Sequence, residues 1–296
     1  MNDMILETAN LTKTYKNVTA LNDFSITLEK NKIYGLLGRN GAGKTTLLNL
    51  LTSRIFAHSG DINIFGENAV ESEAALSKIC YMPEKNMFIP KMKVKEIIAT
   101  SSEFYENFDM NYADKLCDKF KLSKGKKYHE LSRGYESILR IVIGLASHSP
   151  ITIFDEPVLG LDAAVRDMFY KELLEDFIEH PRTIIISTHL IEESANIFSD
   201  IIIIKDGKLI SLTSTEELRE SMFYCSGRED IIDRVLSDMN VIHTEMVGSV
   251  KVCVVHQKLE ASELKRLQDE NLDVSPIPIQ KLFIYFTDND KEATHE

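Results

Sequence analysis

The stretch from Ile33 to Thr52 reads IYGLLGRNGAGKTTLLNLLT and decides the fold. It opens with a compact apolar run that ends in glycine, which is typical of a buried β-strand. Leucines recur at close helical spacing in Thr45–Thr52, so this part predicts a helix. Between the two lies GRNGAGKTT, residues 38–46, which matches the pattern G-x-x-x-x-G-K-[ST]. The sequence therefore predicts a strand, a phosphate-binding loop and a helix in succession.

The residue types of this loop suit the binding of a nucleotide. Its glycines allow backbone N–H groups to curl around phosphates, and the helix N-terminus adds its dipole. Lys44 is expected to reach the β- and γ-phosphates, and Thr45 to offer a ligand to Mg²⁺. We predict ATP and Mg²⁺ as the bound species, with these residues around the phosphates: Gly38, Asn40, Gly41, Gly43, Lys44, Thr45 and Thr46.

A second motif, ITIFDE at residues 151–156, is an apolar strand that ends in two carboxylates. Asp155 is expected to hold Mg²⁺ through water, and Glu156 to face the water that attacks the phosphate. An acidic pair after a strand is by itself most often part of an exposed loop. The phosphate-binding loop upstream reverses that expectation and favours a site for hydrolysis.

Three further motifs follow: LSRGYES at residues 131–137 before a helical pattern at Ile138–Ser147, LGLDA at residues 159–163, and STHLIEE at residues 187–193. In this order around the phosphate loop and the acidic strand, they resemble the nucleotide-binding domain of ABC transporters. The resemblance covers roughly Ile5 to Leu212. It implies an ATPase in which two subunits enclose two ATP molecules.

The resemblance also implies roles for individual residues. Ser132 and the backbone of Gly134 would touch the γ-phosphate of ATP held by a partner subunit, and Asp162 would lie in the loop that crosses the dimer interface. His189 would contact the γ-phosphate in its own subunit, and with Lys44 and Glu156 it completes the catalytic set. Tyr15 occupies the place of an aromatic residue that stacks on adenine. Taken alone, His189 would be a structural histidine near a strand end, and Tyr15 would as readily pack against neighbours in a strand.

Two departures from the family pattern occur. In YMPEKN, Glu84 stands where the family usually has a glutamine that senses Mg²⁺ and the transport partner, and we expect Glu84 near the metal and the nucleotide. In the signature, Arg133 and Tyr135 replace the usual glycine and glutamine. The effect of these changes on turnover is left open, as is the choice between a homodimer and a heterodimer.

The remaining pattern indicates an α/β protein with a P-loop NTPase core. Alternating residues at Met4–Leu11 and Phe24–Leu28 predict an N-terminal antiparallel β subdomain. Isoleucine-rich runs near residues 79, 151, 183 and 201 predict a buried parallel sheet. A helical insertion is expected at about residues 85–148. We predict two domains, a nucleotide-binding domain at 1–213 and a small C-terminal α+β domain at 214–296, with helices at Glu229–Met239 and Ser262–Glu270 and a hairpin around Gly248.

Composition limits the class of protein. Hydrophobic residues at 44% and charged residues at 27% are ordinary for a soluble globular protein. No apolar run approaches the roughly 18 to 20 residues of a membrane span, and no secretion signal is recognisable at the start. Four cysteines without a CxxC pair suggest reduced thiols. A net charge of -12 disfavours nucleic acid as a partner. The expected location is cytoplasmic and peripheral, at the inner face of the membrane through a permease.

The leading functional hypothesis is the ATP-hydrolysing motor subunit of an ABC exporter, coupled to a separate membrane permease and to a second ATPase subunit. The end of the chain, IQKLFIYFT, looks like that of small ABC-2-type exporters. Residues 131–164 are similar to Gram-positive exporters linked to antimicrobial-peptide resistance or to secretion of phenol-soluble modulins, which suggests amphipathic peptides as cargo. The alternatives are a non-transport ABC ATPase acting on a ribosomal or DNA complex, and a regulatory nucleotide-binding module without turnover. The role of the C-terminal domain is open.

Overall fold

The computed structural model describes residues 4–70, 72–85 and 88–288. The chain divides into two compact units, one formed by Met1–Leu190 with Asn196–Leu212, the other by Ile191–Ala195 with Thr213–Glu296. The domains predicted at 1–213 and 214–296 stay a prediction. The segment Ile191–Ala195 is assigned to the second unit in the structure, whereas the sequence placed it in the first domain.

The first unit begins with an antiparallel sheet in the order β2-β1-β4-β5. Its strands are β1 (Met4–Tyr15), β2 (Val18–Glu29), β4 (Ser59–Ile64) and β5 (Glu67–Asn68). In β2, buried and exposed residues alternate from Phe24 to Glu29, so one face of the sheet is apolar. This confirms the predicted N-terminal β layer, and both long strands extend beyond their predicted limits.

A second sheet of the first unit has the order β10-β9-β3-β8-β7-β6. Its strands are β3 (Ile33–Leu37), β6 (Ile79–Met82), β7 (Ile151–Asp155), β8 (Thr183–Ser187), β9 (Asp200–Lys205) and β10 (Lys208–Ser214). The five strands from β9 to β6 pair in parallel, and every residue of β3, β7 and β8 is buried. The predicted parallel core is therefore confirmed. Since parallel strands end at one edge, the loops after β3, β6, β7 and β8 meet there.

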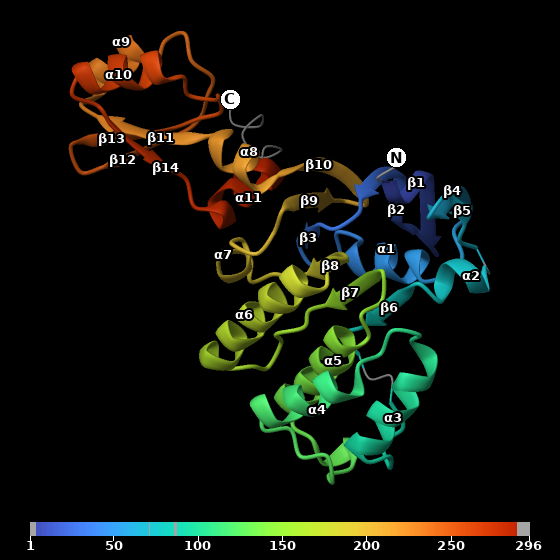
Figure 1. Ribbon diagram of the computed structural model, residues 1–296. Helices are drawn as coiled ribbons and strands as arrows, with labels where there is room; N and C mark the ends of the chain where they lie inside the picture. Colours follow the sequence, from blue (N-terminus) through green and yellow to red (C-terminus); the bar gives the residue numbers. More distant parts are fainter. Residues whose placement is uncertain (1–3, 71, 86–87, 289–296) are drawn as a thin grey trace. The chain divides into compact units, whose positions relative to one another are not determined.

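Helix α1 (Lys44–Leu51) packs between the two sheets, and its four leucines enter one core with Leu6, Ile62 and Ile153. Figure 1 shows α1 between β1 and β2 on one side and β7 on the other. Helices α5 (Arg133–Ala146) and α6 (Ala163–Glu179) pack together, and α5 contacts β6 and β7. The central sheet is thus covered on both faces, as an α/β architecture requires.

The segment between β6 and β7 is helical in its described residues, as predicted. It contains α3 (Val94–Phe104), α4 (Met110–Lys119), the 3₁₀ turn η1 (Tyr128–Glu130) and α5. The short helix α2 (Glu73–Leu76) precedes it. One prediction was wrong: α5 begins at Arg133, not near Ile138. The Ser132 side chain accepts a hydrogen bond from the Tyr135 N–H and caps the helix, so most of the signature motif lies in its first turns.

The second unit is α+β. Its sheet has the order β12-β13-β11-β14, formed by Val241–Val247, Val250–Val255, Phe223–Gly227 and Asp273–Pro276. Helices α9 (Glu229–Val235) and α10 (Ala261–Asp269) confirm the two predicted helices, although α9 ends four residues early, and β12 and β13 form the predicted hairpin. Helices α7 (Ile191–Ser194), α8 (Thr215–Glu220) and α11 (Ile279–Asp288) complete it. The core joins Cys225 and Cys253 to Leu267, and all four cysteines of the chain are buried free thiols.

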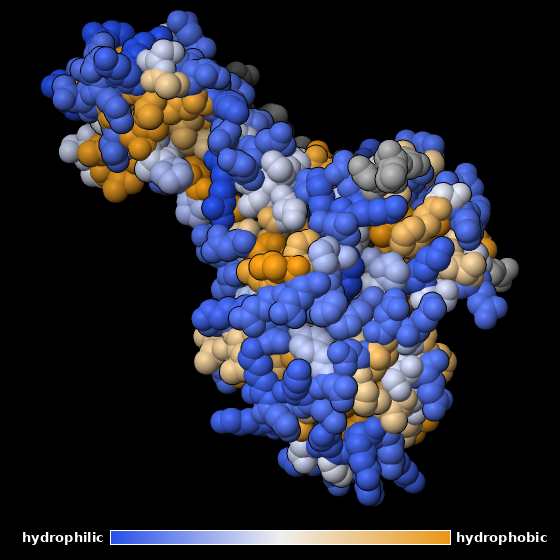
Figure 2. Space-filling model, viewed as in Figure 1, coloured by the Kyte–Doolittle hydropathy of each residue, from blue (hydrophilic) through white to orange (hydrophobic). Residues whose placement is uncertain are grey.

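No helix among the described residues is long and apolar enough to cross a bilayer. The face of the molecule seen in Figure 2 is largely hydrophilic, with hydrophobic residues in separate groups. Among the large hydrophobic side chains that remain exposed, Ile89 and Phe104 belong to the helical segment of the first unit, at 63% and 73% exposure.

Candidate functional site

A cavity of about 660 Å³ lies where the loops after β3, β6, β7 and β8 meet. This volume is in the range of small-molecule sites. Ten residues singled out in the sequence line it: Asn40, Gly41, Gly43, Lys44, Thr45, Thr46, Glu84, Asp155, Glu156 and His189. Three lining residues were missed by sequence reasoning: Ala20, Arg39 and Leu159. Arg39 lies within GRNGAGKTT and Leu159 opens LGLDA, but neither side chain type by itself indicates nucleotide binding, and Ala20 has no signal of its own.

The phosphate loop owes its shape to glycine at Gly43, the residue that precedes α1. Its φ of 109° is disfavoured for residues with a side chain, and a Cβ atom there would lie 2.4 Å from the backbone oxygen of Ala20. Backbone N–H groups of the first helical turn have no partner within the helix, so they are available to an anion at this end. The conformation of the loop therefore suits the binding of a phosphate group.

The ammonium group of Lys44 lies inside the loop. Its Nζ donates hydrogen bonds to the carbonyl oxygens of Gly38, at 2.6 Å, and Arg39, at 3.4 Å. Lys44 is 8% exposed, and burial lowers its pKa, while the charges of Glu156 and Asp155 oppose that shift. Gly38 does not line the cavity and instead supplies the carbonyl that holds Lys44 in place.

Asp155 lies at the carboxyl end of β7, 2% exposed. Its Oδ2 accepts hydrogen bonds from the hydroxyl groups of Thr45, at 3.2 Å, and Tyr81, at 3.5 Å. Burial raises the pKa of this carboxyl group, and the hydrogen bond from Thr45 and the charge of Lys44 act in the opposite direction. Asp155 and Thr45, which come from different motifs, are thus brought into direct contact.

Glu156 and His189 form a second pair. A hydrogen bond of 2.8 Å joins Glu156 Oε2 to His189 Nδ1, and the Glu156 N–H donates to the Ser187 carbonyl at 2.8 Å. Glu156 has a φ of 50°, which is uncommon for a residue with a side chain and is typical of strained functional positions. Burial raises the pKa of its carboxyl group, against the influence of His189 and Lys44. The pair presents a carboxylate of increased basicity to the cavity.

A buried arginine that the sequence analysis did not single out supports the rim of the cavity. Arg140 of α5 donates through Nη1 to the carbonyl oxygens of Pro83, at 2.8 Å, and Glu84. Its Nη2 donates to Ser137 Oγ at 2.7 Å, and the Ser137 hydroxyl donates to the Leu159 carbonyl at 2.7 Å. These bonds connect two cavity-lining positions through α5.

Besides Gly38, four predicted site residues lie outside the cavity of their own chain. Ser132 and Asp162 are exposed and cap α5 and α6, where Asp162 accepts from the Val165 N–H at 2.9 Å. Gly134 packs so closely on the loop before α6 that a Cβ atom would lie 2.7 Å from the Gly160 oxygen. Tyr15 ends β1, is 45% exposed and has the Lys13 ammonium 5.4 Å from its ring centroid.

Comparisons with known proteins agree with this geometry. Residues 21–159 match the family model described as ABC transporter. The chain is 30% identical to the bacitracin transport ATP-binding protein BcrA of Bacillus licheniformis, over 86% of this chain and 82% of that protein. It is 29% identical to the ABC transporter ATP-binding protein YtrB of Bacillus subtilis, over 95% of this chain and 97% of that one.

Solved structures with a similar fold include ATP-binding cassettes of ABC transporters. An ATP-binding cassette solved as a dimer in a post-hydrolysis state, with ADP and phosphate bound, aligns with a TM-score of 0.64 at 22% identity, over 71% of this chain and 99% of that chain. The predicted α/β fold and the family resemblance are confirmed. The chain therefore belongs to the ABC transporter family, as an ATP-binding and ATP-hydrolysing subunit.

Proposed function

We propose that this chain is the motor subunit of an ABC exporter, in which ATP binding closes a pair of ATPase subunits and hydrolysis reopens them. One observation carries the proposal. The residues for phosphate, metal and water line one cavity, whereas Ser132 of the signature lies exposed outside it. A chain with this arrangement needs the signature motif of another subunit to complete its ATP site.

In the proposed reaction, Lys44 binds the β- and γ-phosphates of ATP together with the backbone N–H groups of the loop. Glu156 accepts a proton from the attacking water as the water oxygen bonds to the γ-phosphorus and the bond from that phosphorus to the bridging oxygen breaks, so that ADP and inorganic phosphate are the products. Its raised pKa makes the carboxylate a better base. The imidazole of His189, which is hydrogen-bonded to Glu156, would contact the γ-phosphate.

The residues present suit magnesium. The hydroxyl group of Thr45, the carboxylate of Asp155 and the side chain of Glu84 all line the cavity, and Mg²⁺ prefers oxygen ligands. We assign the metal to these three residues. When bound, the ion would neutralise the charge of the phosphates. The hydrogen bond from Thr45 to Asp155 holds two of these oxygen ligands next to each other.

The proposed partner ATPase is either a second copy of this chain or a related one. It would bring Ser132 and Gly134 to the nucleotide of this subunit and receive the same residues in return, with Asp162 at the interface between them. Arg133 and Tyr135 replace the usual glycine and glutamine of this loop. A partner with an unaltered signature motif would supply the usual contacts to the nucleotide of this subunit. Tyr15 is proposed to stack on the adenine from its exposed position.

The proposed permease docks beside Glu84 and the segment that follows it to Ile98. Asn86, at the start of the predicted docking segment, lies outside the described residues. The exposed Ile89 supplies an apolar contact in this segment. The similarity to a bacitracin transport protein supports export and an amphipathic peptide cargo. The chain would then work in the cytoplasm, peripheral to the membrane through its permease.

The test is co-purification from the native host. Tagged Glu156→Gln protein is extracted in mild detergent with Mg-ATP, which holds the closed state because turnover is blocked, and every accompanying chain is identified. The wild-type protein extracted without nucleotide is the control. Recovery of a multi-span membrane protein supports the exporter. Recovery of ribosomal or DNA-bound proteins without a membrane subunit contradicts it and favours the non-transport alternative.

A further inference from the structure

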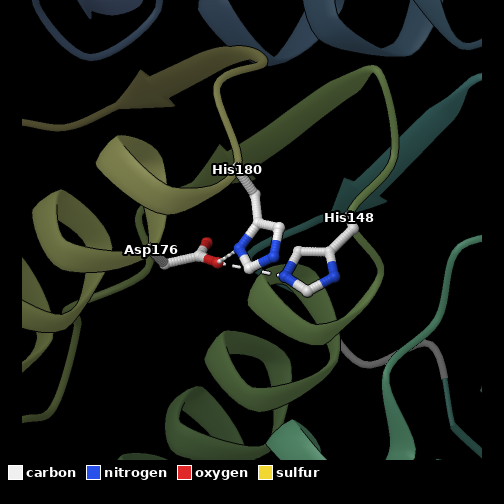
Figure 3. A group of neighbouring side chains, drawn as sticks. All are labelled: His148, Asp176 and His180. Atoms are coloured by element: carbon white, nitrogen blue, oxygen red, sulfur yellow. Dashed lines mark hydrogen bonds and ion pairs between the residues drawn. The ribbon is translucent and has the colours of Figure 1, made fainter.

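A second group of side chains with metal-binding chemistry lies outside the ATP cavity, in the first unit. It consists of His148, in the loop between α5 and β7, Asp176, near the end of α6, and His180, the residue that follows α6. Figure 3 shows both imidazole rings turned toward the same carboxyl group. One ligand atom from each residue lies within 4.8 Å of the others.

The spacing of these atoms fits a tetrahedral ion. His148 Nε2 lies 3.0 Å from Asp176 Oδ1, and His180 Nδ1 lies 3.4 Å from the same oxygen. Ligands bonded to Zn²⁺ at about 2.0 to 2.1 Å in tetrahedral geometry are about 3.3 Å apart. Small rotations of the side chains would therefore place all three atoms around one ion.

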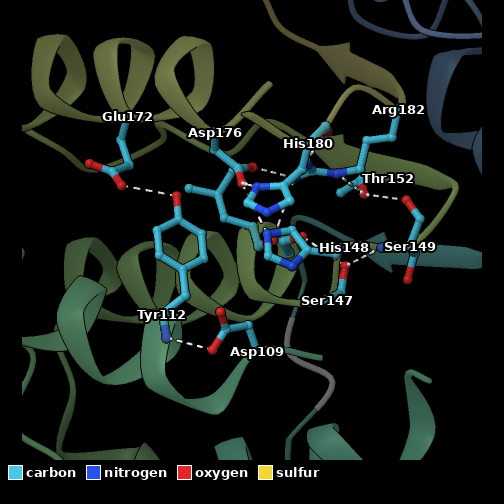
Figure 4. A network of polar contacts seen from close by, with 12 residues as sticks. Asp109, Tyr112, Ser147, His148, Ser149, Thr152, Glu172, Asp176, His180 and Arg182 are labelled. Carbon is cyan, nitrogen blue, oxygen red and sulfur yellow. Dashed lines mark hydrogen bonds and ion pairs between the residues drawn. The ribbon is translucent and has the colours of Figure 1, made fainter. Parts of the chain in front are cut away.

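The neighbours of the group orient it as supporting residues do around bound metals. Arg182 donates from Nη2 to the other carboxylate oxygen, Asp176 Oδ2, at 2.6 Å, so Oδ1 is left to face the histidines (Figure 4). The ring of Tyr112 stacks on that of His148, with centroids 5.6 Å apart and planes 8° from parallel. The orientation of the ligands is thus fixed from two sides.

Charge and access set the expected strength of binding. The positive charge of Arg182 opposes a divalent cation, and the buried carboxylate of Asp176 compensates for it. The carboxylate of Glu172, in contrast, is paired with Lys119. The side chain of His180 is 52% exposed, which gives an ion a path of entry and leaves a coordination position for water. A site with three protein ligands and an open side binds less tightly than a closed structural site.

We propose that His148, Asp176 and His180 form a binding site for a divalent transition metal, with Zn²⁺ as the best match to two imidazoles and one carboxylate. The site is separate from the magnesium site at Asp155. A bound ion joins the loop before β7 to the end of α6. Since β7 carries Asp155 and α6 begins after Asp162, the ion stabilises the frame on which two nucleotide-site motifs are built.

The test is a zinc titration of the chelator-treated, nucleotide-free chain under reducing conditions, in competition with a chromophoric chelator. We expect one Zn²⁺ per chain, and a loss of affinity of at least about tenfold in His148→Gln and in His180→Gln. His129→Gln is the matched control, because His129 is an exposed histidine of the same unit whose Nδ1 lies 2.7 Å from the Pro90 oxygen, away from the three proposed ligands. It should bind as the wild type does.

Cobalt provides a second readout that does not depend on activity. Co²⁺ in place of Zn²⁺ should give visible bands of nitrogen and oxygen ligation without the charge-transfer band of a thiolate. Thermal unfolding without metal checks that the variants are folded. Equal zinc affinity in the wild type, His148→Gln and His180→Gln would overturn the proposal, as would a thiolate band that persists in both. The three residues would then serve only to hold Arg182.

Discussion

The rim of the ATP cavity depends on Arg140, and replacing this residue by methionine tests how the cavity is held. Arg140 is 5% exposed and reaches three acceptors, the carbonyl oxygens of Pro83 and Glu84 and the hydroxyl oxygen of Ser137. Methionine fills a similar volume without any donor. The change leaves the buried carbonyl group of Pro83, the partly exposed carbonyl group of Glu84 and the hydroxyl group of Ser137 without this partner.

The magnitude follows from these bonds. An unsatisfied buried acceptor costs about 1 to 3 kcal/mol, which applies to the Pro83 carbonyl; the Glu84 carbonyl costs less because water can replace Arg140 there. Burial of the guanidinium group is itself unfavourable, as the lowered pKa of Arg140 shows, and methionine removes that cost. We expect Arg140→Met to lower the free energy of unfolding of the first unit by about 1 to 3 kcal/mol.

The assay is urea unfolding followed by circular dichroism, with ATP affinity measured in parallel. Lys171→Met is the control, since Lys171 is an exposed residue of α6 whose ion pair with Asp167 is screened by solvent and should contribute little to stability. ATP affinity should also fall in Arg140→Met, because Glu84 lines the cavity and its carbonyl is held by Arg140. A change in stability no larger than that of Lys171→Met would refute the reasoning.

Three further predictions concern the site. Burial raises the pKa of Glu156, so ionising this carboxyl group lowers the stability of the folded protein as pH rises above the ordinary pKa of about 4.3. Glu156→Gln should therefore raise the thermal midpoint of the nucleotide-free protein near pH 8, and this gain should shrink toward pH 5. A gain that does not vary with pH would count against the raised pKa. Gly134→Ala should lower the free energy of unfolding in urea by about 1 to 3 kcal/mol, since its Cβ atom would lie 2.7 Å from a carbonyl oxygen. Gly125→Ala is the control and should be nearly neutral, because a Cβ atom there meets nothing within 4 Å. Equal effects of the two changes would contradict the packing argument. Asp155→Asn should weaken ATP binding in the presence of Mg²⁺ more than in EDTA, as measured by calorimetry, and equal weakening in both would argue against a metal role.

The sequence predicted those parts of the fold and site that depend on local chemistry. The strand before Gly38, the loop and α1 follow from residues close in the chain, and ten predicted site residues meet in one cavity because parallel strands end at one edge. The start of α5 was misplaced because its first turn, Arg133 to Ser137, is mostly polar and lacks the apolar periodicity that begins at Ile138. In the second unit, β11 and β14 are too short to show a periodicity of their own.

Long-range polar contacts were outside the reach of the sequence. Arg140 lies 56 residues from Glu84 in the chain, and no spacing rule connects a helical arginine to a distant carbonyl group. The same holds for His148, whose partner Asp176 is 28 residues away. Such contacts arise only when the folded sheet brings separate connections together.

Hydrolysis at Glu156 is the central claim, and the most direct test compares ATP binding and phosphate release for the wild type and Glu156→Gln, each purified with the chains that accompany it. Glutamine keeps the size of the side chain and a hydrogen bond to His189 but cannot accept the proton of the attacking water. We expect ATP affinity to stay within about threefold of the wild type, while turnover falls by about 100-fold or more. Turnover equal to that of the wild type would contradict the assignment of Glu156 as the catalytic base.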